Sequence, residues 1–166
     1  MKYIFVFVFI TVFIVFDKSI GYTNTSPVWT HLTFQFQHAN IVHLIINSLA
    51  FTGMFRVSEK IINKYALAAV ILFIPFTASF MSMYEIPTVG ISGTIYAMIG
   101  IYLAMITSEK LIIEDKNKFY VFLFSIIICL IISYFKTNSN FRLHLFSLIT
   151  GYAFWLIVEL WYSVSE

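Results

Sequence analysis

The chain has 166 residues, of which 60% are hydrophobic and 11% are charged, and its mean hydropathy is +0.90. This balance excludes an ordinary soluble globular protein and indicates an integral membrane protein. Too few polar residues remain for a separate soluble domain, so we expect a single membrane domain over residues 1–166, without a nucleic-acid-binding face. The net charge of +2 indicates no partner, and the single cysteine, Cys129, excludes an intramolecular disulfide and a cysteine metal cluster.

Six apolar runs follow one another along the chain, each near the roughly 20 residues that a membrane-spanning helix needs. The predicted spans are residues 3–16, 41–55, 65–83, 89–107, 119–135 and 143–162. The first run also resembles a signal peptide, but no small-x-small cleavage site follows it, so we expect it to be retained. The predicted fold class is therefore all-α, a polytopic membrane protein with a bundle of six transmembrane helices.

The distribution of Lys and Arg predicts how this bundle is oriented. One side comprises the amino terminus and the loops after the second and fourth spans, and it carries Lys2, Arg56, Lys60, Lys64, Lys110, Lys116 and Lys118. The opposite side carries only Lys18, Lys136 and Arg142. By the positive-inside rule both termini are cytoplasmic, and the mixed-charge segments 56–64 and 109–118 are expected to be solvated loops.

The start of the fourth span combines a hydroxyl group with small residues. Ser92 stands in the sequence Gly-Ile-Ser-Gly, and Gly93, Ala97 and Gly100 follow at helical spacing. Such a smooth stripe lets another helix approach closely. On this segment alone, Ser92 could equally be a packing residue that hydrogen-bonds a carbonyl one turn back.

The last span contains a matching face. His144, Ser147 and Gly151 lie on one side of a helix, and His144 falls near the outer end, at the level of Ser92. If the two small-residue faces meet, His144 can reach the Ser92 hydroxyl. A serine hydroxyl is a weak nucleophile until a base takes its proton, and imidazole suits that task near neutral pH.

The second span contributes two further polar side chains at this depth. His43 and Asn47 are four residues apart and point the same way, so together with the Ser92 backbone N–H they could stabilise an oxyanion. His38 is off that face and is expected at the mouth of the helix. Polar residues inside a membrane are functional candidates because each is unfavourable unless paired or hydrated.

Three motifs in this order resemble the rhomboid family of intramembrane serine proteases. They are Gly-x-Ser-Gly at the start of span four, His-x-x-x-Asn in span two, and a histidine above small residues in span six. The resemblance extends from Trp29 to Gly151. It implies that membrane-spanning protein substrates enter from the lipid bilayer and are cut near the outer face, with no cofactor and no metal.

The resemblance also implies a role for each matching position. Ser92 would be the nucleophile and His144 its general base, in a dyad without an aspartate. Tyr96 would stack on His144, and His43 and Asn47 would form the oxyanion hole with the Ser92 N–H. His38 looks like the additional histidine that precedes the span-two motif. The loop of residues 17–37 would be embedded in the membrane surface, and residues 136–142 would form a cap over the cavity.

The chain departs from the family pattern at three positions. Thr30 stands where the family commonly has arginine after Trp29, Leu143 where alanine commonly precedes the histidine, and Ser147 where glycine is common. Serine is still a small residue, so this helix face can still pack closely. Leu143 could alter how the helices approach, and Thr30 removes a charged anchor from the loop.

Two other classes of function fit parts of the pattern. A non-catalytic rhomboid-like protein would bind or escort membrane helices without cutting them. This alternative predicts the loss of Ser92 or His144, and both residues are present. A metal site could use the four histidines His31, His38, His43 and His144, although zinc sites usually include a carboxylate or cysteine. The abundance of Ile, Phe and Lys suggests an AT-rich bacterial genome, so we expect the bacterial cytoplasmic membrane; the sequence carries no sign of an oligomeric state.

Overall fold

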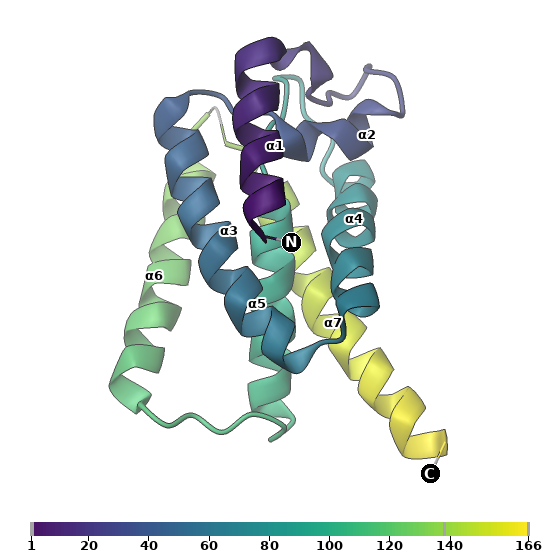
Figure 1. The fold of residues 1–166 in the computed structure, drawn as a ribbon, viewed down its shortest axis with the longest axis vertical. Helices are drawn as coiled ribbons and strands as arrows, with labels where there is room; N and C mark the ends of the chain where they lie inside the picture. Colours follow the sequence, from purple (N-terminus) through teal and green to yellow (C-terminus); the bar gives the residue numbers. More distant parts are fainter. Residues whose placement is uncertain (1, 138, 166) are drawn as a thin grey trace.

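The computed structural model describes residues 2–137 and 139–165 and consists of helices and the loops that join them (Figure 1). The long helices are α1 (Lys2–Val15), α3 (Ile41–Ile61), α4 (Lys64–Met81), α5 (Ser92–Thr107), α6 (Lys116–Phe135) and α7 (Phe141–Ser165). The loop between α1 and α3 contains α2 (Thr30–Thr33) and the short 3₁₀ helices Lys18–Ile20 and Phe34–Phe36. No strand forms in the described residues, which confirms the all-α class.

Five of the six predicted spans begin and end within three residues of the observed helices, but the end of the second span is wrong. Helix α3 continues to Ile61, through residues that were predicted to form a loop after residue 55. Residues 56–61 contain no Gly or Pro, and their Glu and Lys are favourable helix formers, so the helix extends beyond its apolar stretch. The Asn63 side chain then starts α4 by accepting hydrogen bonds from the backbone N–H groups of Tyr65 and Ala66.

The start of the fourth span also differs, because α5 begins at Ser92 and not at residue 89. Gly90 has a φ of 120°, a conformation that L side chains rarely adopt and that does not continue into a helix. Its backbone N–H donates to the carbonyl of Phe34, 2.9 Å away, in the loop before α3. The serine therefore lies in the first turn of its helix, directly after a turn.

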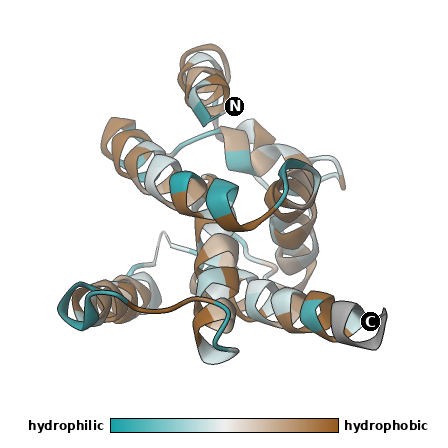
Figure 2. Ribbon diagram, turned by 60° about the horizontal axis from the view of Figure 1, so that its bottom comes forward, coloured by the Kyte–Doolittle hydropathy of each residue, from teal (hydrophilic) through white to brown (hydrophobic). Residues whose placement is uncertain are grey.

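Four described helices are long and apolar enough to cross a membrane, namely α3, α4, α6 and residues Phe141–Trp161 of α7. Helices α1, with 14 residues, and α5, with 16, are apolar but shorter. Hydrophilic residues gather towards the ends of the helices and in the loops, as the teal segments of Figure 2 show. This arrangement is that of an integral, multi-pass membrane protein.

Helix α5 runs through the centre of the bundle and packs closely against α7. A Cβ atom added to Gly151 would lie 2.1 Å from the carbonyl oxygen of Ala97, and one added to Gly100 would lie 2.1 Å from that of Leu148. These distances are too short for any side chain, so the two helix backbones touch. The close approach of the two small-residue faces is as expected from the sequence.

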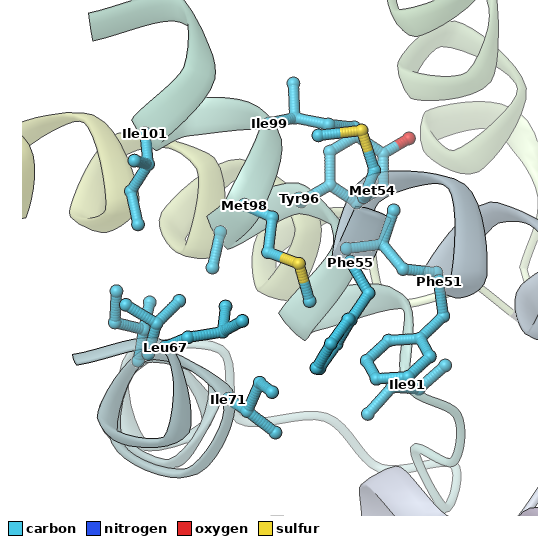
Figure 3. Packing of buried hydrophobic residues seen from close by; sticks show 14 of the residues in the cluster. Phe51, Met54, Phe55, Leu67, Ile71, Ile91, Tyr96, Met98, Ile99 and Ile101 are labelled. Atoms are coloured by element: carbon cyan, nitrogen blue, oxygen red, sulfur yellow. The ribbon is translucent and has the colours of Figure 1, made fainter. Parts of the chain in front are cut away.

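The apolar core fills the space between α3, α4 and α5 (Figure 3). Phe51 and Phe55 from α3 meet Ile71 from α4 and Met98 from α5, and all four side chains are buried. Helix α1 covers the outer side of α3, where the ring of Phe9 lies 5.6 Å from that of Phe51. This core supports α5 on the sides that α7 leaves open.

Helix α6 stands to one side of the bundle (Figure 1). Its described residues include only two buried ones, Ile126 and Ser133, and its other side chains are half-buried or exposed. An apolar helix needs no protein cover where lipid surrounds it, because lipid tails are as apolar as its own side chains.

Candidate active site

The first turn of α5 and the first turn of α7 bring a serine and a histidine together. The Oγ of Ser92 lies 2.8 Å from the Nε2 of His144, although the residues are 52 positions apart in the chain. Both side chains are half-buried. The distance allows a proton to pass directly between the hydroxyl and the imidazole.

Tyr96 holds one face of the imidazole ring. Its ring is stacked on that of His144, with 4.7 Å between centroids and 23° between planes. Tyr96 follows Ser92 by one helical turn, so one face of α5 presents both the hydroxyl and the aromatic ring to α7.

His43 and Asn47 lie together against the turn that precedes Ser92. The Nδ2 of Asn47 is 2.9 Å from the Nε2 of His43. A Cβ atom on Gly90 would lie 2.7 Å from the His43 ring and 3.0 Å from the Asn47 amide, so both side chains touch the Gly90 backbone. Asn40 sets the start of this helix, because its side chain accepts from the backbone N–H of His43.

His38 lies in the segment just before α3, and its ring contacts that of His43. Its ring centroid is 5.3 Å from that of His43 and 5.5 Å from that of Phe9, and 2% of its surface is exposed. Neither ring nitrogen has a hydrogen-bond partner among the described residues. Burial, with a smaller effect of His43, lowers the pKa of His38 to about 3, so the ring is neutral. It lines a pocket of about 560 Å³ beside the end of α1, together with Asp17 and Gln37.

The remaining histidine, His31, has a different environment. Its ring is sandwiched between those of Tyr22 and Phe80, at centroid distances of 4.8 and 4.2 Å. Its Nδ1 lies 2.8 Å from the Oγ of Ser79, and burial lowers its pKa. Within residues 2–137 and 139–165, no three His, Cys, Asp or Glu side chains lie close enough together to hold a metal ion. The four histidines therefore do not form the metal cluster considered as an alternative.

Ser133 contacts the histidine from the other side and was missed in the sequence. Its Oγ lies 2.8 Å from the Nδ1 of His144 and 2.7 Å from the Oγ of Ser139. Hydrogen bonds thus run from Ser139 through Ser133 and His144 to Ser92. The available signal was a polar residue inside the otherwise apolar stretch 126–135.

Asn140 anchors the start of α7 and was also missed. Its Oδ1 accepts from the backbone N–H of Leu143, which makes it the N-cap of the helix. Its Nδ2 lies 3.0 Å from the hydroxyl of Tyr22 and 2.9 Å from both the Ser82 carbonyl and the Thr88 hydroxyl. An asparagine just before an apolar run is a helix-start signal, but its three distant partners have no signature in the sequence.

The three departures from the family pattern are all buried. Thr30 hydrogen-bonds within its own loop, to the Ser26 hydroxyl and the Pro27 carbonyl. Leu143 and the Ser147 hydroxyl face Gly93, and a Cβ atom there would lie 3.5 and 3.3 Å from them. The helices accommodate both side chains on the face that carries His144. Residue 138, within the predicted cap of residues 136–142, lies outside the described residues.

The fold and the site define an all-helical, multi-pass membrane protein with a serine and a histidine paired between two helices. A model of the Rhomboid domain matches residues 25–160, and the chain therefore belongs to the rhomboid family. A protein of Acanthamoeba polyphaga mimivirus, named "Putative rhomboid protein", is 25% identical over 169 residues, which cover 96% of this chain and 93% of that protein. The matched residues include all the site residues described above.

Proposed function

We propose that this chain is an intramembrane serine endopeptidase that hydrolyses peptide bonds of transmembrane helices near the outer face of the membrane. The observation that carries the proposal is the 2.8 Å separation of Ser92 Oγ and His144 Nε2. Family membership alone does not establish activity, because the rhomboid family includes inactive members.

In the proposed reaction Ser92 is the nucleophile and His144 the general base. The hydroxyl proton passes to Nε2 as Oγ bonds to the substrate carbonyl carbon, and the carbonyl oxygen becomes an oxyanion. The imidazolium then gives the proton to the leaving amine as the peptide bond breaks, which leaves an acyl group on Ser92. Water releases that group by the same steps, its proton passing to His144. Tyr96 holds the ring in place throughout.

The oxyanion would be stabilised by His43, Asn47 and the backbone N–H of Ser92. The Nδ2 of Asn47 carries two N–H groups, so one can donate to the His43 ring while the other is directed towards the oxyanion. One such donor typically lowers the barrier by about 3 kcal/mol. His38, through its ring contact with His43, would restrict where that side chain can point.

We infer that the domain comprises the whole of residues 1–166 and that α1 and α5 also span the membrane, which makes six spans. Both termini would be cytoplasmic, on the basis of the Lys and Arg distribution, and Ser92 and His144 would lie towards the outer face. The substrates would be single-pass membrane proteins with small or helix-breaking residues near that face, because an intact helix hides its carbonyl groups. The proposed location is the bacterial cytoplasmic membrane.

The test is labelling of the detergent-solubilised protein with a fluorophosphonate probe, alongside cleavage of a model transmembrane substrate. Wild type is compared with Ser92→Ala and His144→Ala, and with Ser125→Ala as a matched control. Ser125 is an exposed serine of α6 whose hydroxyl donates to the Val121 carbonyl. We expect labelling and cleavage by wild type and Ser125→Ala, and neither by the two site variants.

A folded wild-type protein that neither labels nor cleaves would contradict the proposal. The alternative of a protein that binds or escorts membrane helices would then be pursued. Labelling that persists in Ser92→Ala would show that another hydroxyl is the reactive group and would also refute the assignment.

A further inference from the structure

Ser133 is the only buried polar residue among the described residues of α6, and it points at the proposed base. It is 5% exposed, and its Oγ lies 2.8 Å from His144 Nδ1. A buried hydroxyl in a helix that otherwise faces lipid is unfavourable unless it is paired. The Ser133 hydroxyl is paired with Nδ1 of His144, whereas Nε2 of the same ring meets Ser92.

Another serine of the same helix shows how a hydroxyl is usually satisfied in this setting. Ser125, eight residues earlier, donates to the Val121 carbonyl one turn back at 2.8 Å. Ser133 instead bonds across to α7 and to Ser139. Its partners therefore come from tertiary structure.

The proposed reaction requires one particular form of the imidazole. A neutral histidine carries its proton on one nitrogen and accepts on the other. His144 can take a proton from Ser92 only if Nε2 has a free lone pair, so the proton must be on Nδ1. A nearby acceptor at Nδ1 selects that form.

Stacking on Tyr96 does not by itself make this selection. It holds the plane of the His144 ring, but a half turn about the Cβ–Cγ bond keeps that plane and would place the carbon Cε1 where Nε2 meets Ser92. A hydrogen bond from Nδ1–H to an acceptor opposes this rotation of the ring and also opposes placement of the proton on Nε2.

We propose that Ser133 is a positioning residue, whose Oγ accepts the Nδ1–H of His144 and whose own O–H donates to Ser139. This inference rests on the proposed function of Ser92 and His144. When Nε2 takes the Ser92 proton, both ring nitrogens carry hydrogen, and the Ser133 oxygen continues to accept from Nδ1. The bond thus also stabilises the charged ring. An acceptor in this place supplies, without a carboxylate, the orientation that an aspartate provides in a triad.

The first measurement is the imidazole ¹⁵N spectrum of the full-length protein in detergent, with His144→Ala to assign the signal. We expect wild type to carry the proton on Nδ1 and Ser133→Ala to carry it partly on Nε2. Ser133→Thr retains a hydroxyl and should keep the wild-type form. Ser125→Ala is the matched control on the same helix.

The second measurement is the kinetics of cleavage of a model transmembrane substrate. We expect kcat to fall about tenfold in Ser133→Ala, the effect of losing one neutral hydrogen bond in the transition state, with little change in KM. Ser133→Thr should restore kcat. A merely structural role would not change the proton position together with kcat while leaving KM intact.

The inference is overturned if wild-type His144 carries its proton on Nε2, or if Ser133→Ala leaves both the spectrum and kcat unchanged. A wild type that does not cleave would refute the proposed function, and the spectrum would still decide whether Ser133 selects the proton position. The two failures are therefore distinguishable.

Discussion

Helices α5 and α6 are both apolar, yet one is at the centre of the molecule and the other at its edge. Helix α5 has 11 buried residues out of 16, whereas the described residues of α6 include only Ile126 and Ser133 as buried ones out of 20. Hydrophobicity cannot explain the difference. The two helices differ in the size of their side chains, because α5 carries small residues at helical spacing and α6 is mostly Ile, Phe, Leu and Tyr.

This difference shows how helices associate in a membrane. Lipid satisfies apolar side chains as well as protein does, so burial of bulky residues provides little driving force. Small residues let two backbones touch, and dispersion contacts then hold the pair together. The proposed nucleophile and base lie on the two helices that pack in this way, which gives their 2.8 Å contact a rigid support.

The largest effect is expected where this close packing is broken. Gly151→Ala places a methyl group 2.1 Å from the Ala97 carbonyl oxygen, which forces α5 and α7 apart. Overpacking of this kind typically costs about 3 kcal/mol, so the free energy of unfolding in detergent should fall by that amount. Gly53→Ala is the matched control, because nothing lies within 4 Å of a Cβ atom there.

Cleavage should also fall in Gly151→Ala, because Ser92 and His144 separate with their helices. Equal stability of the two alanine variants would show that the α5–α7 contact does not hold the bundle together.

A second pair of variants compares the two helices directly. Ile101 of α5 is 0% exposed and Ile132 of α6 is 56% exposed. Ile101→Ala leaves a cavity and should reduce the free energy of unfolding by about 2 kcal/mol. Ile132→Ala removes contacts with lipid and should change it by less than about 0.5 kcal/mol.

Thermal unfolding of the two variants in the same detergent provides the measurement. A large loss in Ile132→Ala would mean that protein, such as another copy of the chain, covers this face of α6.

The last prediction concerns the pH dependence of stability, which is expected from His38, a buried residue just before α3. Its folded pKa of about 3 lies below the usual value of 6.5. Between pH 3 and pH 6.5 the unfolded state binds a proton at His38 that the folded state does not bind. The free energy of unfolding is therefore highest above pH 6.5 and falls as the pH is lowered. The loss is about 1.4 kcal/mol for each pH unit well below 6.5.

The variant His38→Phe should remove this contribution, which the pH dependence of the free energy of unfolding would detect. The lowered pKa of His31 acts in the same direction and remains as background in both proteins. An unchanged slope between pH 6 and 4.5 would show that His38 is accessible to protons in the folded state.

The sequence by itself determined much of the local structure and the candidate site. Apolar runs predicted the long helices, and helical spacing predicted the faces of α5 and α7 that meet. The same spacing indicated that His144 could reach Ser92 if the two small-residue faces met, and the resemblance to the rhomboid family implied that Tyr96 would stack on His144. The errors, at residues 56–61 and 89–91, arose because helix ends depend on backbone hydrogen bonds as well as on hydropathy.

Only the tertiary structure decided which groups surround the histidine. Helix α6 is apolar on all sides, so its sequence contains no signal for its rotation about its own axis, and the contact of Ser133 with His144 could not be predicted. The same holds for Asn140, whose partners Tyr22, Ser82 and Thr88 come from two separate loops. Periodicity within one helix indicates which residues share a face, but the partner of that face depends on how all the helices pack together.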